Sequence, residues 1–444
     1  MYNHSISKQK LEDTTLAHDT PVEFSELIIY EVFPRAYSDS GFKGITRDLE
    51  KIGNMGINTI WLMPIHPTGL EKRKGTLGSP YSIRDYYEVD SKLGSKEDFR
   101  RLIGEAHEIG LKVLMDMVLN HTSPDSVLAK QHPEWFFHNE KGIPIPRNPD
   151  WEDVIDLDYS HKELWGYMIN MMKYWIEEFN VDGFRCDVAG LVPLEFWIEA
   201  RRQLNQIKKL IWISETHDPY MYQAFDITYD YDGYYKLMEY LNGTALLTDY
   251  VGYIKMQEQI YPRNYIKLRF LENHDQNRIA SIVEDDLKLR SLFVYLFTVK
   301  GVPLIYNGQE LKLKEKPDIF NEYKIPWEKE NRDWIEFCRK LCFMKQNSII
   351  LKRGDMRFLD NSSSQNTMTF IRYFRGTKKF ILVVLPLDGV IDSLRIKFSG
   401  VLEPFKRYHA INMLNEKITN FSLNGNFETF LENIDEPLVL SFHG

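Results

Sequence analysis

The chain of 444 residues contains only three cysteines, Cys186, Cys338 and Cys342. Cys338 and Cys342 are four residues apart on an expected helix around residues 334–344, and the odd total argues against a disulfide framework. A hydrophobic content of 43% is that of a globular protein.

Long apolar runs are absent as well. No stretch approaches the roughly 20 apolar residues of a membrane span. Residues 1–20 are polar and mixed in charge, with no apolar segment of signal-peptide length. We therefore expect a cytoplasmic protein that has no membrane partner.

An excess of positive charge is also missing. The formal net charge of -9 disfavours nucleic acid or another polyanion as the main partner. Aromatic residues, in contrast, are plentiful at 14%. Core packing accounts for most of them, but the same residues suit a site that stacks sugar rings. Nothing in the sequence specifies an oligomeric state.

Four short segments that carry carboxylates occur in order along the chain, each at or just beyond the end of an apolar run. They are residues 116–121, 183–187, 213–216 and 272–275. The apolar runs 112–117, 180–184, 210–214 and 265–271 have the β-branched and aliphatic character of strands buried on both faces. If these strands close into a (β/α)8 TIM barrel, the carboxylates converge where the loops after the strands build an active site.

Strand and helix patterns alternate through most of the chain. A chain of 444 residues exceeds a barrel of roughly 250 residues, which leaves room for an insertion and a further domain. We predict an N-terminal extension over residues 1–23 and a barrel over 24–121 and 161–346. Residues 122–160 lack a period and are predicted to form an inserted subdomain after strand three. Residues 350–444 are predicted to form an antiparallel β domain of sandwich type.

The element ranges expected from periodicity follow the same alternation. Strands are expected at 28–33, 59–63, 112–117, 180–184, 210–214, 224–228, 265–271 and 302–306. Helices are expected at 45–55, 96–109, 162–179, 194–207, 246–260 and 287–299. In the C-terminal part, residues 367–374, 379–385 and 438–442 alternate as antiparallel strands do.

The residue types in the four segments fit the cleavage of a glycosidic bond. Cleavage with retention needs two carboxyl groups about 5 Å apart, one as nucleophile and one as acid and then base. Arg185 and Asp187 point to the same face of a strand, so the arginine favours an ionised Asp187 as nucleophile. Glu215, on the adjacent strand, is the expected acid/base. Three further residues are candidates for stabilising or binding the sugar: Asp275, His121 and His274.

In this order, the four segments resemble the signature regions of glycoside hydrolase family 13, the α-amylase family. The first resembles its Asp-x-x-x-Asn-His region, the second its Gly-Phe-Arg-x-Asp region, and Glu215 and Asn273-His274-Asp275 fall in the third and fourth. Residues 79–86 and 301–310 also resemble family segments, so the similarity runs from about residue 27 to 310. The resemblance implies a barrel with an insertion after strand three and retaining action on α-glucosidic bonds.

The resemblance also implies roles for individual residues. Tyr81 is expected to stack on the sugar at the cleavage site, and Asp85, in the same segment, and Arg185 are also expected to bind the substrate. Asp116 is expected to hold the arginine and the site together. Asn120 is either a calcium ligand or a satisfied polar group, and Arg278 reaches either a substrate hydroxyl or a carboxylate at the barrel rim.

Two departures from the family bear on metal and specificity. Many α-amylases carry a Lys-His pair shortly after the nucleophile, but residues 188–191 of this chain are Val-Ala-Gly-Leu. Calcium is therefore a possible cofactor only through Asn120, and no redox or organic cofactor is implied. Val188 resembles family members that accept α-1,6 bonds.

We expect an enzyme that hydrolyses α-1,4 bonds in maltooligosaccharides or dextrins, with an α-glucan as its substrate partner. A glucanotransferase or an α-1,6-acting glucosidase on the same scaffold is the alternative, because both use the same three carboxylates. A non-catalytic binding subunit would tolerate loss of a carboxylate, and all three are present.

Overall fold

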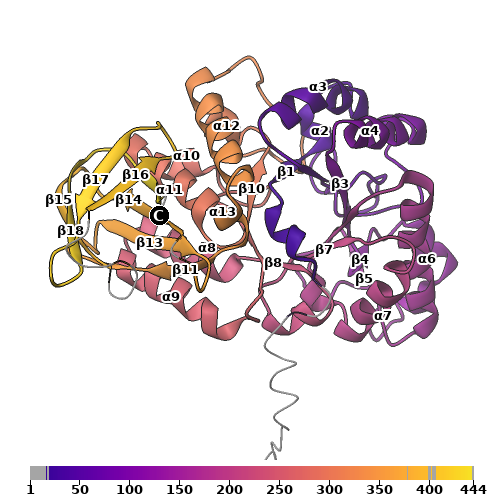
Figure 1. Ribbon diagram of the computed structural model, residues 1–444. Helices are drawn as coiled ribbons and strands as arrows, with labels where there is room; N and C mark the ends of the chain where they lie inside the picture. The colour runs from indigo at the N-terminus through magenta and orange to yellow at the C-terminus, as the bar shows by residue number, and fades with distance from the viewer. Residues whose placement is uncertain (1–16, 18–19, 378, 399–401, 403–406, 443–444) are drawn as a thin grey trace, which may run out of the picture.

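The computed structural model describes residues 17, 20–377, 379–398, 402 and 407–442. Within these residues, eight parallel strands close into a barrel in the order β1-β10-β9-β8-β7-β6-β3-β2 (Figure 1). This confirms the predicted TIM barrel. The barrel strands are β1 Ile29–Val32, β2 Thr59–Leu62, β3 Lys112–Met117, β6 Gly183–Cys186, β7 Ile211–Ser214, β8 Ile227–Tyr229, β9 Lys267–Arg269 and β10 Val302–Tyr306.

Helices follow the strands around the outside of the barrel. The longer ones are α3 Phe42–Asn54, α4 Lys96–Glu108, α6 Lys162–Phe179, α7 Leu194–Leu204, α8 Tyr231–Leu241, α9 Leu247–Ile260, α11 Asp286–Thr298 and α12 Arg332–Gln346. Shorter helical segments are η1 Val22–Glu26, α2 Pro34–Tyr37, η3 Ala189–Leu191, η4 Pro219–Gln223, α10 Ile279–Ile282, η5 Gln309–Leu311 and α13 Ile349–Arg353. Helix α8 was not among the elements expected from the sequence, because its tyrosines and Gly233 have weak helix propensity.

The segment between β3 and α6 forms a small lobe over the barrel. It carries the two-stranded antiparallel pair β4 His121–Thr122 and β5 Ile155–Asp156, with α5 Val127–Gln131 and η2 Pro133–Trp135 between them. We call residues 122–160 domain B. The boundaries of domain B stay a prediction. The pairing of β4 with β5 places Asp156 opposite His121, which belongs to the first carboxylate-bearing segment.

The C-terminal residues form two antiparallel sheets, orange to yellow in Figure 1. One sheet has the order β11-β13-β14-β19-β16-β17 and the other β12-β15-β18. Their bounds are β11 Asp355–Phe358, β12 Asp360–Asn361, β13 Thr367–Tyr373, β14 Phe380–Pro386, β15 Ile391–Lys397, β16 Arg407–Asn412, β17 Ile418–Ser422, β18 Glu428–Ile434 and β19 Leu438–Phe442. The sheets share one apolar cluster, which includes Leu382 and Leu394. The predicted antiparallel β domain is therefore confirmed.

The β domain packs against α9, α11 and α13 of the barrel layer. Arg372 of β13 is fully buried there. Its guanidinium donates to the carbonyl oxygens of Thr298 and Gly354, at 2.6 and 2.7 Å. These bonds satisfy carbonyl groups at the end of α11 and after α13 that would otherwise be buried without partners.

Most of the predicted N-terminal extension, residues 1–16 and 18–19, lies outside the described residues. Thr20 donates its hydroxyl to Asp226 at 2.9 Å. Among the described residues, no helix combines the length and the apolar character needed to span a bilayer.

Two long loops at the carboxyl ends of the strands meet above the barrel. The loop over residues 63–95 follows β2, and the loop over 312–331 precedes α12. Leu77 N–H donates to the carbonyl of Phe320 at 2.8 Å, and Thr76 N–H donates to the side chain of Asn321 at 3.0 Å. The two loops and domain B therefore enclose the space above the strand ends.

Candidate active site

Three adjacent barrel strands bring the polar residues of the first three segments together. In the register of β3 and β6, Asp116 lies beside Arg185. Asp187 follows directly after β6, and Glu215 follows directly after β7. The carboxyl ends of parallel strands are where TIM barrels place reacting groups.

Arg185 connects these carboxyl groups. Its Nη1 donates to Asp116 Oδ1 and to Asp187 Oδ1, both at 2.9 Å, and its Nη2 lies 2.5 Å from Glu215 Oε1. The guanidinium is fully buried, and the rings of Trp61, Tyr81 and Tyr229 lie 5.1 to 5.6 Å from it. One cation therefore compensates three carboxyl groups in a site with little water.

Burial outweighs the arginine in setting the pKa values of the two aspartates. Desolvation, and next the charge of Glu215, raise the pKa of Asp187 well above its ordinary value, although Arg185 lowers it. Burial also raises the pKa of Asp116 to about 6 against the effect of Arg185. Arg185 was expected to favour an ionised Asp187, but this one cation is shared by three carboxyl groups, and burial outweighs its effect.

Glu215 is held by a donor from each of two further elements. The backbone N–H of Val188 donates to Oε2 at 2.7 Å, and the hydroxyl of Tyr231, at the start of α8, donates to Oε1 at 2.8 Å. Val188 adopts φ +37°, a left-handed conformation that is strained for a β-branched residue. In this conformation the N–H of Val188 points toward Glu215, the acid/base candidate.

The fourth segment places a charged histidine beside Asp275. His274 Nδ1 lies 2.5 Å from Glu31 Oε1, and His274 Nε2 lies 3.3 Å from Asp275 Oδ2. Although burial opposes protonation, these two carboxylates raise the pKa of His274 well above its ordinary value. Burial likewise works against the charge of Asp275, but His274 and Arg185 lower its pKa. The Asp275 side chain is 42% exposed, so an ionised carboxylate faces the cavity.

His121 also lies near a catalytic carboxylate but, unlike His274, it is neutral. Burial lowers the pKa of His121 to about 4. Its Nε2 lies 3.9 Å from Asp187 Oδ2, and its Nδ1 lies 3.1 Å from the side-chain nitrogen of Asn120. Since the amide nitrogen can only donate, Nδ1 is the acceptor and Nε2 carries the proton.

These groups open into a cavity of about 190 Å³. Tyr81 forms one wall, where its ring stacks on His274 with centroids 5.3 Å apart. The cavity is lined by Lys74, Ser79, Tyr81, His121, Trp151, Asp153, Val154, Asp187, Val188, Glu215, His274, Asp275 and Phe320. It therefore contains the three proposed catalytic carboxylates and three of the six proposed binding residues, Tyr81, His121 and His274. Arg185 lies beneath it.

The lining residues that come from the loops and domain B were not expected from the sequence. Trp151 of domain B lies with its ring centroid 5.4 Å from that of His121. Lys74 lies 3.0 Å from Asp153 and joins the loop after β2 to domain B. These side chains sit in segments without periodicity, so only the high aromatic content and the length of the loops pointed to them.

Two proposed binding residues lie outside the cavity. Asp85 caps its own turn, where its Oδ1 accepts from Tyr87 N–H at 3.0 Å. Arg278 donates to Glu272 at 2.7 Å and to the carbonyl of Asn307 at 2.9 Å. Neither side chain lines the cavity, and their roles in binding stay predictions. The contacts of Arg278 match its other possible role, with a carboxylate at the barrel rim.

The side chain of Asn120 is hydrogen-bonded to a cation of domain B. Its side-chain oxygen accepts from Arg147 Nη2 at 2.9 Å. Within the described part of the chain, no group of three or more His, Cys, Asp or Glu side chains is arranged to hold a metal ion. These contacts match the second of the two roles considered for Asn120, a satisfied polar group, and calcium binding stays a prediction.

A barrel whose strand ends gather closely placed carboxyl groups around one buried arginine defines a glycosidase-type active site. The chain belongs to the α-amylase family, because the family model for the α-amylase catalytic domain matches residues 31–341. The resemblance seen in the sequence is thereby confirmed.

Solved structures and characterised relatives agree with this membership. A maltogenic α-amylase of Thermotoga neapolitana is 51% identical, with a TM-score of 0.90 over 95% of this chain and 99% of that one. An α-amylase of Lactobacillus plantarum is 35% identical, with a TM-score of 0.85 over 95% of this chain and 100% of that one. Alpha-amylase 2 of Dictyoglomus thermophilum is 29% identical over 76% of this chain. The chain spans 66% of the length of that relative.

Proposed function

We propose that this protein is a retaining α-glycosidase that hydrolyses α-1,4 bonds in maltooligosaccharides or dextrins. The observation that carries the proposal is the single guanidinium of Arg185, which contacts both Asp187 and Glu215. Two carboxyl groups that share one guanidinium lie close together, as retention requires. The names of the similar enzymes, α-amylase and maltogenic α-amylase, support the choice of substrate.

In the first step, a carboxylate oxygen of Asp187 attacks the anomeric carbon, and Glu215 transfers its proton to the glycosidic oxygen as the bond breaks. Burial and the charge of Glu215 raise the pKa of Asp187, whereas the reaction needs an ionised Asp187 and a proton on Glu215. Substrate binding must therefore leave Asp187 ionised. The arginine bond to Asp187 Oδ1 favours this arrangement once water is excluded.

In the second step, Glu215 removes a proton from water, and the water oxygen replaces Asp187 at the anomeric carbon. Between the two steps Glu215 is a carboxylate, which the backbone N–H of Val188 and the hydroxyl of Tyr231 stabilise by hydrogen bonds. Asp275, which is ionised and exposed to the cavity, stabilises positive charge on the sugar or accepts its hydroxyls.

The sugar at the cleavage site is expected to lie against the ring of Tyr81. His121 Nε2–H and the imidazolium of His274 can each donate to its hydroxyls, since both side chains line the cavity. Trp151 and Phe320 extend the apolar surface on the side of domain B and the last loop. We further propose a cytoplasmic location, because all three cysteines are free and buried.

Product analysis by chromatography tests the proposal. The pure protein is incubated with maltoheptaose, panose and isomaltose, and the Asp187→Asn variant is the control. Short maltooligosaccharides from maltoheptaose alone would support the α-1,4 hydrolase. Products longer than maltoheptaose would instead show a glucanotransferase, and glucose from isomaltose would show action on α-1,6 bonds.

A further inference from the structure

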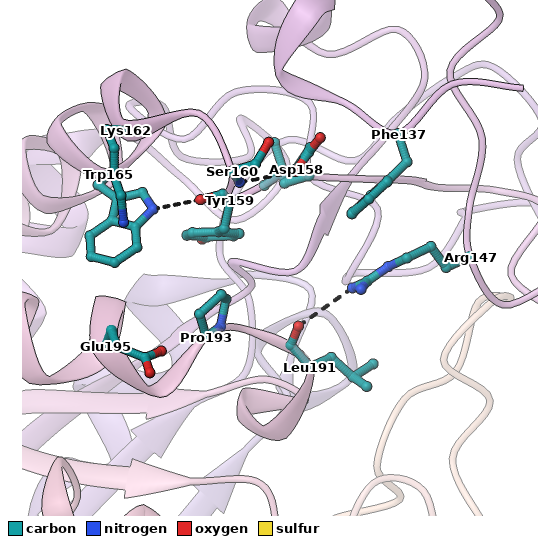
Figure 2. Close-up of a pocket in the computed structure, with 11 residues that line it drawn as sticks. Phe137, Arg147, Asp158, Tyr159, Ser160, Lys162, Trp165, Leu191, Pro193 and Glu195 are labelled. Atoms are coloured by element: carbon teal, nitrogen blue, oxygen red, sulfur yellow. Dashed lines mark hydrogen bonds between the residues drawn. The ribbon is translucent and has the colours of Figure 1, made fainter.

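Three oxygen atoms from separate segments converge on the guanidinium of Arg147, in domain B. Nε donates to Asp156 Oδ2 at 2.9 Å, and Nη2 donates to Asn120 Oδ1 at 2.9 Å and to the carbonyl of Leu191 at 3.4 Å. Figure 2 shows Arg147 reaching toward Leu191, with the ring of Phe137 beside it. The arginine thus connects domain B with the end of β3 and with the segment that follows the nucleophile.

A carboxylate, an amide oxygen and a backbone carbonyl are the ligand types that calcium prefers. Here a guanidinium already donates to all three, and a metal ion at coordination distance would have to displace it. The Asp156 carboxylate is 1% exposed, and Oδ1 has no hydrogen-bond partner among the described residues. The ion-pair partner of the Asp156 carboxylate is Arg147. Calcium therefore does not fit these residues as they stand.

The arginine also determines how the neighbouring amide is oriented. Because Asn120 Oδ1 accepts from Arg147, the Asn120 side-chain nitrogen faces His121 Nδ1, 3.1 Å away. That contact leaves the proton of His121 on Nε2, which faces Asp187 Oδ2 at 3.9 Å. A chain of contacts therefore runs from Arg147 through Asn120 and His121 to the nucleophile.

We propose that Arg147 is a positioning residue that supplies a built-in cation where a metal ion would otherwise join domain B to the barrel. It holds Asp156, Asn120 and the carbonyl of Leu191 in place, and through Asn120 it keeps the His121 proton on the nitrogen that faces the active site. The role of His121 rests on the proposed glycosidase function, whereas the cation role does not.

The cation role is tested by thermal unfolding, which needs no activity. The parent, Arg147→Ala and Arg147→Lys are unfolded in EDTA and in millimolar calcium chloride. Arg202→Ala is the control, since Arg202 is an exposed arginine paired only along its own helix in the contacts described. We expect the parent to unfold at the same temperature in both solutions. We expect Arg147→Ala to unfold several degrees lower, with Arg147→Lys between them and Arg202→Ala unchanged.

A parent that unfolds at a lower temperature in EDTA than in calcium would overturn the proposal, because a metal ion would then be part of the site. Equal unfolding temperatures for Arg147→Ala and the parent would overturn it as well. Arg147→Lys keeps the charge, so the comparison remains measurable if the alanine variant does not fold.

The positioning role is tested by a double-mutant cycle on kcat for maltoheptaose. We expect Arg147→Ala to lower kcat about ten-fold in the parent, with a smaller change in KM, since one oriented hydrogen bond is at stake. In a His121→Ala background the same substitution should change kcat less than about two-fold. An equal loss of kcat in both backgrounds would show that Arg147 acts only through folding. It would overturn the proposal that Arg147 positions the His121 proton.

Discussion

Arg185 and Asp187 are separated by one residue, and the arginine Nη1 donates to the aspartate Oδ1 at 2.9 Å. The bond orients the carboxylate for attack, but it does not neutralise the site, because Asp116 and Glu215 contact the same guanidinium. Burial and the charge of Glu215 consequently raise the pKa of Asp187. The nucleophile is therefore held in place at a cost in folding free energy.

Replacing this nucleophile should abolish activity and increase stability. The folded pKa of Asp187 is raised above its unfolded value near about 4, so the ionised form destabilises the fold once the pH exceeds the unfolded pKa. Asp187→Asn should lower kcat at least about 1,000-fold. It should raise the unfolding temperature at pH 7 by about 1–3 °C, and by less at pH 4. Calorimetry at the two pH values measures the difference.

The control for that experiment is Asp39→Asn, because the Asp39 side chain is 92% exposed. It should leave both activity and unfolding temperature unchanged. An Asp187→Asn variant that unfolds below the parent at pH 7 would show that the Arg185 bond outweighs burial and repulsion.

The pH profile of the first step should depend on Glu215. With α-maltosyl fluoride the leaving group needs no proton, and kcat/KM reports the attack by ionised Asp187. In Glu215→Gln the neighbouring negative charge is gone, so the pKa of Asp187 should fall. The acid limb of kcat/KM should then move to lower pH by about one unit or more relative to the parent. A limb that stays in place or moves to higher pH would contradict the effect of the Glu215 charge on the pKa of Asp187.

Tyr231 should contribute to catalysis through the carboxyl group of Glu215. Tyr231→Phe removes the hydroxyl that donates to Oε1 at 2.8 Å while keeping the ring. We expect kcat on maltooligosaccharides to fall about ten-fold, since a hydrogen bond to a charged group is lost. The matched control is Tyr235→Phe, one turn further along α8, where the ring is 54% exposed. Equal activities of the two variants would remove Tyr231 from the mechanism.

Arg278 should matter for stability and not for substrate binding. Arg278 and Glu272 are both 1% exposed, and lysine cannot reproduce the geometry of the hydrogen bonds to Glu272 and to the carbonyl of Asn307. Arg278→Lys should lower the unfolding temperature by several degrees, because a buried ion pair is weakened. The KM for maltoheptaose should stay within about two-fold. A large increase in KM without loss of stability would restore Arg278 to the substrate site.

Much of the fold follows from the sequence where periodicity is strong. The ranges expected for β3, α6, β10 and β19 agree with the structure at both ends. Continuous apolar runs identify buried parallel strands, and a strong helical period identifies the helices around them. The candidate carboxylates Asp187 and Glu215 followed from their positions after two such runs.

Other features depend on contacts between distant segments and were not accessible in this way. The short strand β6 begins three residues later than expected, because Gly183 and not the apolar Val181 starts the pairing with β7. Tyr231 contacts Glu215 only because α8 begins next to the barrel mouth. Arg147 is a charged residue in an aperiodic loop, and its three oxygen partners are spread over more than 70 residues of sequence.

The assignment of Asp187 as the nucleophile is tested most directly by trapping the covalent intermediate. The protein is incubated with a fluorinated maltosyl fluoride, whose ring fluorine slows hydrolysis of the glycosyl ester, and is then digested and analysed by mass spectrometry. We expect one maltosyl unit on the peptide that contains Asp187, with the label absent from Asp187→Asn. A label on Glu215 or Asp275 would contradict it.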